Sequence, residues 1–188
     1  MKQAMVLLAA ALVAGCVSSG PREADRYFLL EAASEPGAAP NTAPTVRVAP
    51  TSASSFYDTQ DIVYSRARGT RGYYQFNHWT ERPQRTIHTQ LASRLQAVDP
   101  KSGLVLSTHL EEIYHDAAEL PGTARIALTA QLVDPANNAV LARRTFNRSA
   151  PAASYDAPGA VQGFRQALAA LLDDVVAWVE AEVQPRAR

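Results

Sequence analysis

The sequence predicts a single α+β or α/β domain in which a mixed, mostly antiparallel sheet packs against two main amphipathic helices. Two observations carry this prediction. Residues 104–146 alternate apolar and polar side chains with a period of two, and turn-forming residues interrupt the alternation twice. Residues 80–98 and 164–178 repeat apolar side chains every three or four positions, as amphipathic helices do.

The first residues have the features of an export signal that is removed from the mature chain. Lys2 precedes an apolar stretch that is too short to cross a bilayer, and the stretch ends in the run Val-Ala-Gly-Cys that closes at Cys16. This pattern resembles the signal of bacterial lipoproteins, in which the cysteine sulfur takes a diacylglyceryl group and the freed amine a third acyl chain. We therefore expect residues 1–15 to be a lipoprotein signal peptide.

Residues 16–25 are predicted to form the lipidated cysteine and a polar tether, and residues 26–184 the folded domain. Cys16 is the only cysteine, so it has no disulfide partner in an exported chain. The residue after the cysteine is Val17 and not aspartate. This pattern resembles that of lipoproteins sent to the periplasmic face of the outer membrane. An ordinary signal peptide with a chance cysteine is the alternative.

Four short extended segments are predicted before the first helix. Residues 27–30 are an apolar, aromatic run bounded by charge, which predicts a buried first strand. Residues 46–48 alternate apolar and polar side chains and open a second strand. Residues 62–64 form a third, and the glycines that follow allow a hairpin with residues 73–76.

The first helix is predicted to start at Thr80 as its N-cap, with Pro83 in the first turn, where a missing N–H costs nothing. Trp79 lies just before this cap and is expected to pack on the first turn. The apolar side of the helix is made by Ile87, Leu91, Leu95 and Val98.

The segment from residue 104 to residue 146 is expected to be a three-stranded meander. Its first strand places Leu104, Leu106, Leu110 and Tyr114 on one face and Ser107, His109, Glu111 and His115 on the other. His109, Glu111 and His115 are the best candidates for a metal site. However, residues six apart on a strand lie about 20 Å apart, so a solvated strand face is the preferred interpretation.

The last periodic segment predicts an amphipathic helix that packs on the sheet. Its apolar side is formed by Phe164, Leu168, Leu171, Val175 and Trp178. A helix lying on a membrane surface is the alternative. The acidic residues Asp173, Asp174 and Glu180 disfavour it, because anionic lipid would repel them.

Composition and motifs exclude several classes of function. The formal net charge is +0, so the chain lacks the excess positive charge of a nucleic-acid binder. The sequence has no Gly-x-Ser-x-Gly elbow, phosphate loop, His-Glu-x-x-His motif or dinucleotide fingerprint. We therefore predict that the protein is not an enzyme, and that it carries no catalytic residues and no metal site.

Aromatic residues are concentrated in one short part of the chain. Half of them lie there, namely Phe56, Tyr57, Tyr64, Tyr73, Tyr74, Phe76 and Trp79. Most are interpreted as core beneath the first helix. Adjacent Tyr73 and Tyr74 cannot both point inward from a regular strand, so one of them is expected at the surface. The candidate partner-binding residues are Tyr57, Tyr73, Tyr74 and Trp79, because Tyr and Trp favour interfaces.

The order of these motifs resembles a known family. Phe-Tyr-Asp-Thr-Gln-Asp-Ile-Val-Tyr at residues 56–64, His-Trp-Thr-Glu-Arg-Pro at residues 78–83 and the early aromatic run at residues 27–30 follow a lipid-type cysteine. Together they resemble the ABC-type transport auxiliary lipoproteins, the paraquat-inducible protein C family. That family commonly has arginine before the tryptophan, where this chain has His78.

The resemblance implies a non-enzymatic accessory of an MCE/ABC-type lipid transport system. The lipoprotein would be anchored at the periplasmic face of the outer membrane and dock the periplasmic MCE-domain protein of the transporter. No cofactor is expected apart from the covalent lipid on Cys16, and the sequence leaves open a homo-oligomer. The alternative is an envelope interaction lipoprotein that activates a cell-wall synthase or assists outer-membrane assembly.

Overall fold

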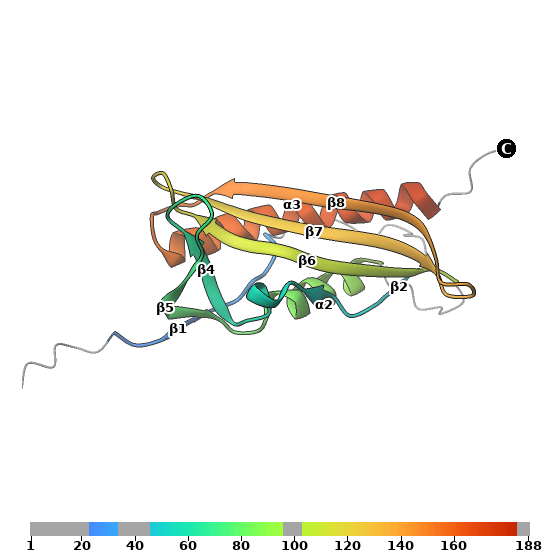
Figure 1. Ribbon diagram of the computed structural model, residues 1–188, viewed down its shortest axis with the longest axis horizontal. Helices are drawn as coiled ribbons and strands as arrows, with labels where there is room; N and C mark the ends of the chain where they lie inside the picture. Colours follow the sequence, from blue (N-terminus) through green and yellow to red (C-terminus); the bar gives the residue numbers. More distant parts are fainter. Residues whose placement is uncertain (1–22, 34–45, 96–102, 184–188) are drawn as a thin grey trace, which may run out of the picture.

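The elements of the fold follow the predicted order of strands, helix, strands and helix (Figure 1). The computed structural model describes residues 23–33, 46–95 and 103–183; Cys16 and the signal peptide lie outside them. In chain order the elements are β1 (Arg26–Phe28), β2 (Arg47–Val48), β3 (Ser52–Ala53), the 3-10 turn η2 (Ser55–Tyr57), β4 (Asp61–Ser65), β5 (Gly72–Trp79), α2 (Pro83–Leu95), β6 (Val105–Asp116), β7 (Thr123–Asp134), β8 (Ala139–Pro151) and α3 (Ala157–Val183).

All eight strands belong to one sheet, in the order β1-β5-β4-β6-β7-β8, with β2 and β3 also paired to β6. The pairs β4–β5, β6–β7 and β7–β8 are antiparallel. The pair β1–β5 is parallel, as are the pairs that β2, β3 and β4 make with β6. The predicted mixed, mostly antiparallel sheet with two main helices is confirmed. The predicted hairpin of β4 and β5 is confirmed as well.

The meander of β6, β7 and β8 is the largest part of the sheet. The predicted segment is confirmed, although its last strand continues to Pro151 rather than ending at Phe146. The inner face of β7 is formed by every second residue, and all of these are buried: Ala124, Ile126, Leu128, Ala130 and Leu132. Asn138 in the turn before β8 has a φ of 56°, a left-handed conformation that asparagine tolerates better than most residues.

A β-bulge changes the inner face of β6 halfway along the strand. The pairing with β7 shifts register between Leu110 and Glu112, and one extra residue in a strand moves every later side chain to the opposite face. Leu106 and Leu110 point inward as predicted, but beyond the bulge His115 is buried and Tyr114 lies on the outer face. The predicted faces of Tyr114 and His115 are therefore wrong.

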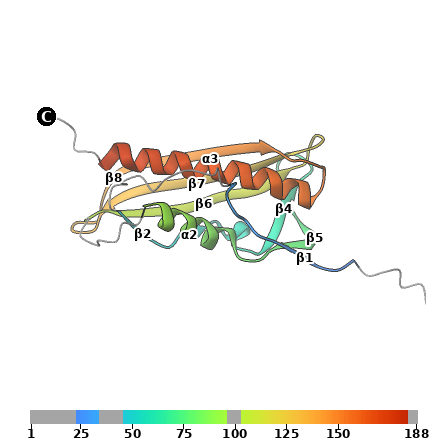
Figure 2. The ribbon, with the colours of Figure 1, turned by 180° about the vertical axis from the view of Figure 1, so that it is seen from behind.

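Both helices lie on the same face of the sheet (Figure 2). In α3 all five predicted inner residues are buried, so the predicted amphipathic side is confirmed. The helix starts earlier than the apolar pattern indicated, because the Asp156 carboxylate accepts a hydrogen bond from the backbone N–H of Gly159 at 2.8 Å and caps it. Asp173 forms an ion pair with Arg94 in α2, and Asp174 forms one with Arg148 in β8.

The helix α2 begins at Pro83, later than predicted. Thr80 does not cap it; its backbone N–H donates to the carbonyl of Phe28 at 2.9 Å, and thereby ties β1 to the end of β5. Ile87, Leu91 and Leu95 are buried as predicted. Val98, the last residue of the predicted apolar side, lies outside the described residues.

The first strand is shorter and more exposed than predicted. β1 spans three residues at the edge of the sheet, and both Tyr27 and Leu29 are exposed. Leu30 alone of the apolar run is fully buried, beyond the end of the strand. Only one face of this run packs on the core: Phe28 and Leu30 turn inward, while Tyr27 and Leu29, which alternate with them, face solvent.

Trp79 links the end of β5 to α3 within the core. It is the last residue of β5, is 1% exposed, and meets the ring of Phe164 in α3 edge-on at a centroid distance of 5.5 Å. This contact with α3 was not predicted, and the expected packing of Trp79 on the first turn of α2 stays a prediction.

We expect Trp79→Ala to lower the free energy of unfolding by about 3–5 kcal/mol, because it removes a fully buried indole and leaves a cavity. Urea denaturation measures this change. Tyr73→Ala is the control, since that side chain is exposed, and its cost should stay near 1 kcal/mol. Equal losses in the two variants would contradict the assignment of Trp79 to the core.

Candidate partner-binding surface

Two aromatic side chains form an exposed stack next to the hairpin of β4 and β5. Phe56 is 39% exposed and Tyr73 is 42% exposed, and their rings lie 4.8 Å apart with an interplanar angle of 13°. The Tyr73 hydroxyl donates a hydrogen bond to the Phe56 carbonyl at 3.3 Å, which helps to hold the stack in place. Stacked aromatic rings that remain in water present a rigid, largely apolar contact area.

Arg71 is linked to the stack through Tyr57, whose ring meets Phe56 edge-on at a centroid distance of 5.6 Å. Its guanidinium lies 3.7 Å from the ring centroid of Tyr114 and donates through Nε to the Tyr57 hydroxyl at 3.0 Å. It also forms an ion pair with Glu112 at 3.3 Å. A guanidinium that stacks on one ring and bonds two further groups has little freedom left. We call Phe56, Tyr57, Arg71, Tyr73 and Tyr114 the aromatic patch.

The bulge in β6 is what brings Tyr114 into the aromatic patch. Without the register shift, Tyr114 would face the core and Arg71 would lose the ring on which it lies. Tyr57 is buried and contributes its hydroxyl, not an exposed ring. Of the four predicted partner-binding residues, Tyr73 lies at the surface and Tyr57 lies in the support beneath it.

Tyr74 and Trp79 do not belong to the aromatic patch. Tyr73 and Tyr74 point in different directions, as predicted, and the Tyr74 hydroxyl donates to His115 Nδ1 at 2.8 Å inside the protein. Burial raises the pKa of the Tyr74 hydroxyl to about 12. Trp79 lies in the core, as described above. Tyr74 is half-buried and Trp79 is fully buried.

His115 is a fully buried polar residue that the sequence placed on the solvated face. Its Nε2 lies 3.4 Å from the carbonyl of Pro121, which can only accept, so Nδ1 is the nitrogen that accepts from Tyr74. The ring of Tyr155 meets the imidazole edge-on at 6.2 Å. Burial lowers the pKa of His115, because a charged imidazolium is costly away from water.

His109 and His115 lie on opposite faces of the sheet, so the structure does not bring the candidate metal ligands together. Within residues 23–33, 46–95 and 103–183, no three His, Cys, Asp or Glu side chains form a group that could hold a metal ion. The two ring nitrogens of His109 instead bond the hydroxyls of Ser52 at 2.8 Å and Ser54 at 3.1 Å. These contacts join β3 to β6, and sequence reasoning missed them because they link distant segments.

His78 occupies the position where the related family commonly has arginine. Its Nδ1 lies 2.8 Å from Asp61, and its Nε2 lies 3.7 Å from Asp25. The ring also packs against Tyr27 at 5.4 Å. The imidazole thus lies between two carboxylates and ties the start of the described chain to β4 and β5.

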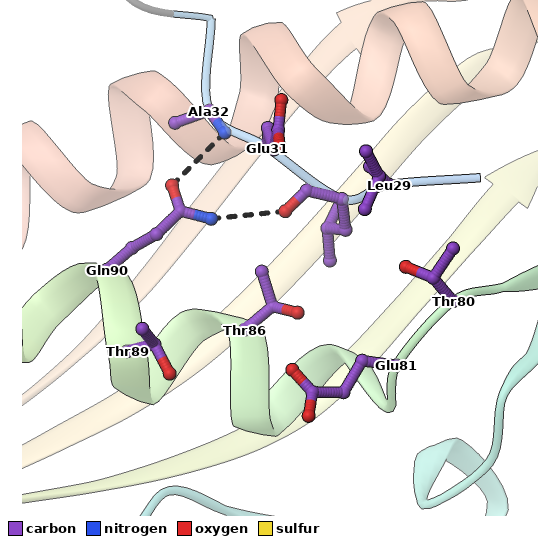
Figure 3. Close-up of a pocket in the computed structure, with 9 residues that line it drawn as sticks. Leu29, Glu31, Ala32, Thr80, Glu81, Thr86, Thr89 and Gln90 are labelled. Atoms are coloured by element: carbon purple, nitrogen blue, oxygen red, sulfur yellow. Dashed lines mark hydrogen bonds between the residues drawn. The ribbon is translucent and has the colours of Figure 1, made fainter.

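A shallow groove of about 380 Å³ lies between α2 and the segment that follows β1 (Figure 3). The amide of Gln90 holds its wall by donating to the Leu30 carbonyl and accepting from the Ala32 N–H, both at 3.1 Å. Glu81 on its rim is paired with Arg85 at 3.3 Å. The groove therefore shows how the chain after β1 is fastened to α2, and it brings together no acid and base for catalysis.

Comparison with known proteins identifies relatives of both sequence and fold. Residues 27–176 match the family model described as ABC-type transport auxiliary lipoprotein component. No curated protein matches the chain. A crystal structure of a Xanthomonas campestris protein assigned to the family DUF330 has a TM-score of 0.75 and 22% identity, covering 85% of this chain and 97% of its own. A protein described as uncharacterized has a TM-score of 0.61 and 14% identity, covering 84% and 99%.

None of the helices in the described part of the chain is both long enough and apolar enough to cross a bilayer.

We expect the free energy of unfolding to fall as the pH drops below about 6.5, because the pKa of His115 is lower in the folded than in the unfolded chain. The unfolded chain then takes up the proton first, and one such group contributes about 1 kcal/mol between pH 7.5 and pH 5.5. Urea denaturation at the two pH values measures the difference.

The control for this pH dependence is His115→Gln, which keeps hydrogen-bonding groups but cannot titrate in this range. The other histidines remain in the variant, so the comparison isolates His115. An identical drop in stability in the parent protein and in the variant would show that His115 is not its source.

Proposed function

Because this chain belongs to the family of ABC-type transport auxiliary lipoprotein components, we propose that it is a non-enzymatic accessory of an MCE/ABC-type lipid transport system. Its role is to dock the periplasmic MCE-domain protein while a lipid anchor holds it at the outer membrane. The aromatic patch is the docking surface.

The exposed stack of Phe56 and Tyr73 is the observation that supports this proposal most directly. Residues that dominate binding energy at interfaces are enriched in tyrosine, tryptophan and arginine and are well packed. Phe56 and Tyr73 are exposed but held by each other, and Arg71 is fixed by Tyr114 and Glu112. A surface ordered before binding loses little side-chain entropy when a partner covers it.

The lipid anchor is proposed from the sequence at Cys16. A second acyl chain is already sufficient for stable attachment, since each buried methylene contributes about 0.8 kcal/mol. Val17 after the cysteine favours the outer membrane over the inner membrane. The anchor and the aromatic patch have separate tasks. The anchor sets the location of the domain, and the aromatic patch selects the protein partner that binds there.

A role without catalysis agrees with the contacts of the histidines. A serine hydroxyl next to an imidazole occurs in nucleophilic enzymes, where the second nitrogen bonds a carboxylate that orients the ring. In His109 a serine hydroxyl lies on each nitrogen, and the nearest carboxylate, Glu111, lies 3.8 Å from Nε2, the same atom that faces Ser54. This arrangement suits a structural link between strands.

We expect Cys16→Ala to release the protein from the membrane while the folded domain stays intact, because the substitution removes the sulfur that carries the lipid. Cell fractionation measures the distribution between the membrane pellet and the soluble periplasmic fraction. Circular dichroism of the soluble variant is the control for folding. A variant that remains in the membrane pellet would argue against a lipid on Cys16.

We expect the double variant Phe56→Ala, Tyr73→Ala to bind the MCE-domain protein roughly thirtyfold more weakly, which corresponds to about 2 kcal/mol for the loss of a binding hot spot. Titration of the purified partner measures Kd. Val140→Ala is the matched control, because Val140 is also an exposed apolar side chain but lies in the hairpin of β7 and β8. Equal affinities of the double variant and the control would remove the aromatic patch from the interface.

A further inference from the structure

Two loops lie side by side at the end of the molecule where the described chain begins. One joins β4 to β5 and the other joins β6 to β7 (Figures 1 and 2). The backbone N–H of Ala117 donates to the carbonyl of Ser65 at 2.7 Å, so the loops are in direct contact. The hairpin of β7 and β8 lies at the opposite end of the long strands (Figure 1).

The loop between β6 and β7 displays a large apolar side chain in a fixed position. Leu120 is 76% exposed, the highest exposure of any large apolar residue in the described part of the chain. The loop is held by the Tyr155 hydroxyl, which donates to the Ala117 carbonyl, and by the Ala152 N–H, which donates to the Gly122 carbonyl at 3.0 Å.

The buried imidazole of His115 packs beneath the same loop. Its Nε2 faces the Pro121 carbonyl, and a side chain at Gly122 would collide with the ring. Gly122 also has a φ of 94°, which residues with a side chain rarely adopt. The exposure of Leu120 is therefore imposed by the surrounding structure and does not arise from a loosely held loop.

The neighbouring loop adds positive charge. Arg66 and Arg68 are exposed, and neither forms an ion pair with a carboxylate of the described residues. The guanidinium of Arg66 lies over the ring of Tyr64, 5.0 Å from its centroid. Beside Leu120 the exposed acid is Glu119, while Asp116 is paired with Arg125 at 2.9 Å. Asp156, next to Tyr155, is exposed as well, but its carboxylate accepts hydrogen bonds from the Ser154 hydroxyl at 2.6 Å and the Gly159 N–H at 2.8 Å.

We propose that this end of the domain rests on the lipid bilayer, with Leu120 inserted among the headgroups and Arg66 and Arg68 on anionic lipid phosphates. An exposed leucine flanked by arginines and a tyrosine is the combination that favours the boundary between headgroups and acyl chains. We call Arg66, Arg68, Leu120 and Tyr155 the lipid-facing end.

This contact rests on the proposed function, because the lipid on Cys16 brings the domain to the bilayer. Glu23 lies seven positions after Cys16, and this stretch spans at most about 25 Å when fully extended. Strands of twelve residues such as β7 are about 40 Å long. A short tether that leaves from the same end as Leu120 therefore holds this end at the membrane and points the β7–β8 hairpin away from it.

The test places a fluorescent thiol label at Leu120→Cys in the full-length, membrane-purified protein. The protein is reconstituted into vesicles of phosphatidylethanolamine and phosphatidylglycerol that contain a nitroxide-labelled lipid as quencher. Val140→Cys is the matched control, since Val140 is 54% exposed and lies in the hairpin at the opposite end. We expect quenching at Leu120→Cys to exceed that at Val140→Cys by about threefold or more, as expected for a residue at headgroup depth.

Reversing the charge of the two arginines provides a second test of the contact, again measured by quenching. Adding Arg66→Glu and Arg68→Glu to Leu120→Cys should lower the quenching in vesicles with phosphatidylglycerol and leave it unchanged in vesicles of phosphatidylcholine alone. Equal quenching at Leu120→Cys and Val140→Cys would overturn the bilayer contact. Shielding of the Leu120 label only after the MCE-domain protein is added would also overturn it, and would assign the surface to a protein partner.

The number of labels per chain separates failure of this contact from failure of the anchor. Cys16 should be consumed by lipid, so mass spectrometry should find one label on each variant. Two labels would show a free thiol at Cys16 and would overturn the anchor together with the bilayer contact. One label combined with equal quenching would overturn the bilayer contact alone.

Discussion

The covering of the β6–β7–β8 meander by α3 is the constraint on which the rest of the structure depends. Three long strands with one apolar face cannot remain in water, and the helix buries that face with a continuous row from Phe164 to Trp178. Each fully buried large side chain in such a row contributes about 1.5–3 kcal/mol. Trp79 meets the same helix at Phe164, so α3 also holds the strands β1, β4 and β5, which join the meander through the pairing of β4 with β6.

Features with a regular period were predictable, and features set by single residues or distant partners were not. The alternation in β7 and the spacing in α3 follow from the requirement that one face be dry, and both predictions are confirmed. The bulge after Leu110 interrupts the alternation in β6, but the sequence gives no sign of it. Tyr114 and His115 were therefore predicted on the wrong faces. Thr80 and Pro83 illustrate the related uncertainty of helix starts, which depend on local hydrogen bonds.

At the candidate site, the sequence predicted which residues gather but not how their side chains contact one another. The cluster of aromatic residues predicted a functional region, and the alternation rule separated Tyr73 from Tyr74 correctly. The sequence did not reveal that Tyr73 stacks on Phe56, because the pair is joined only when η2 folds against the β4–β5 hairpin. Arg71 was missed for a similar reason, since its contacts with Tyr114 and Glu112 reach across the sheet to β6.

His115 links the stability of the domain to the shape of its lipid-facing end. The imidazole that burial keeps neutral is the surface on which Gly122 and Pro121 rest, and these residues hold Leu120 outward. A charged imidazole would donate from both nitrogens, so the half-buried Tyr74 hydroxyl would have to change from donor to acceptor and find another partner for its own proton. The bulge in β6 turns His115 inward, and His115 in turn supports the exposed loop. The sequence revealed neither the bulge nor this support.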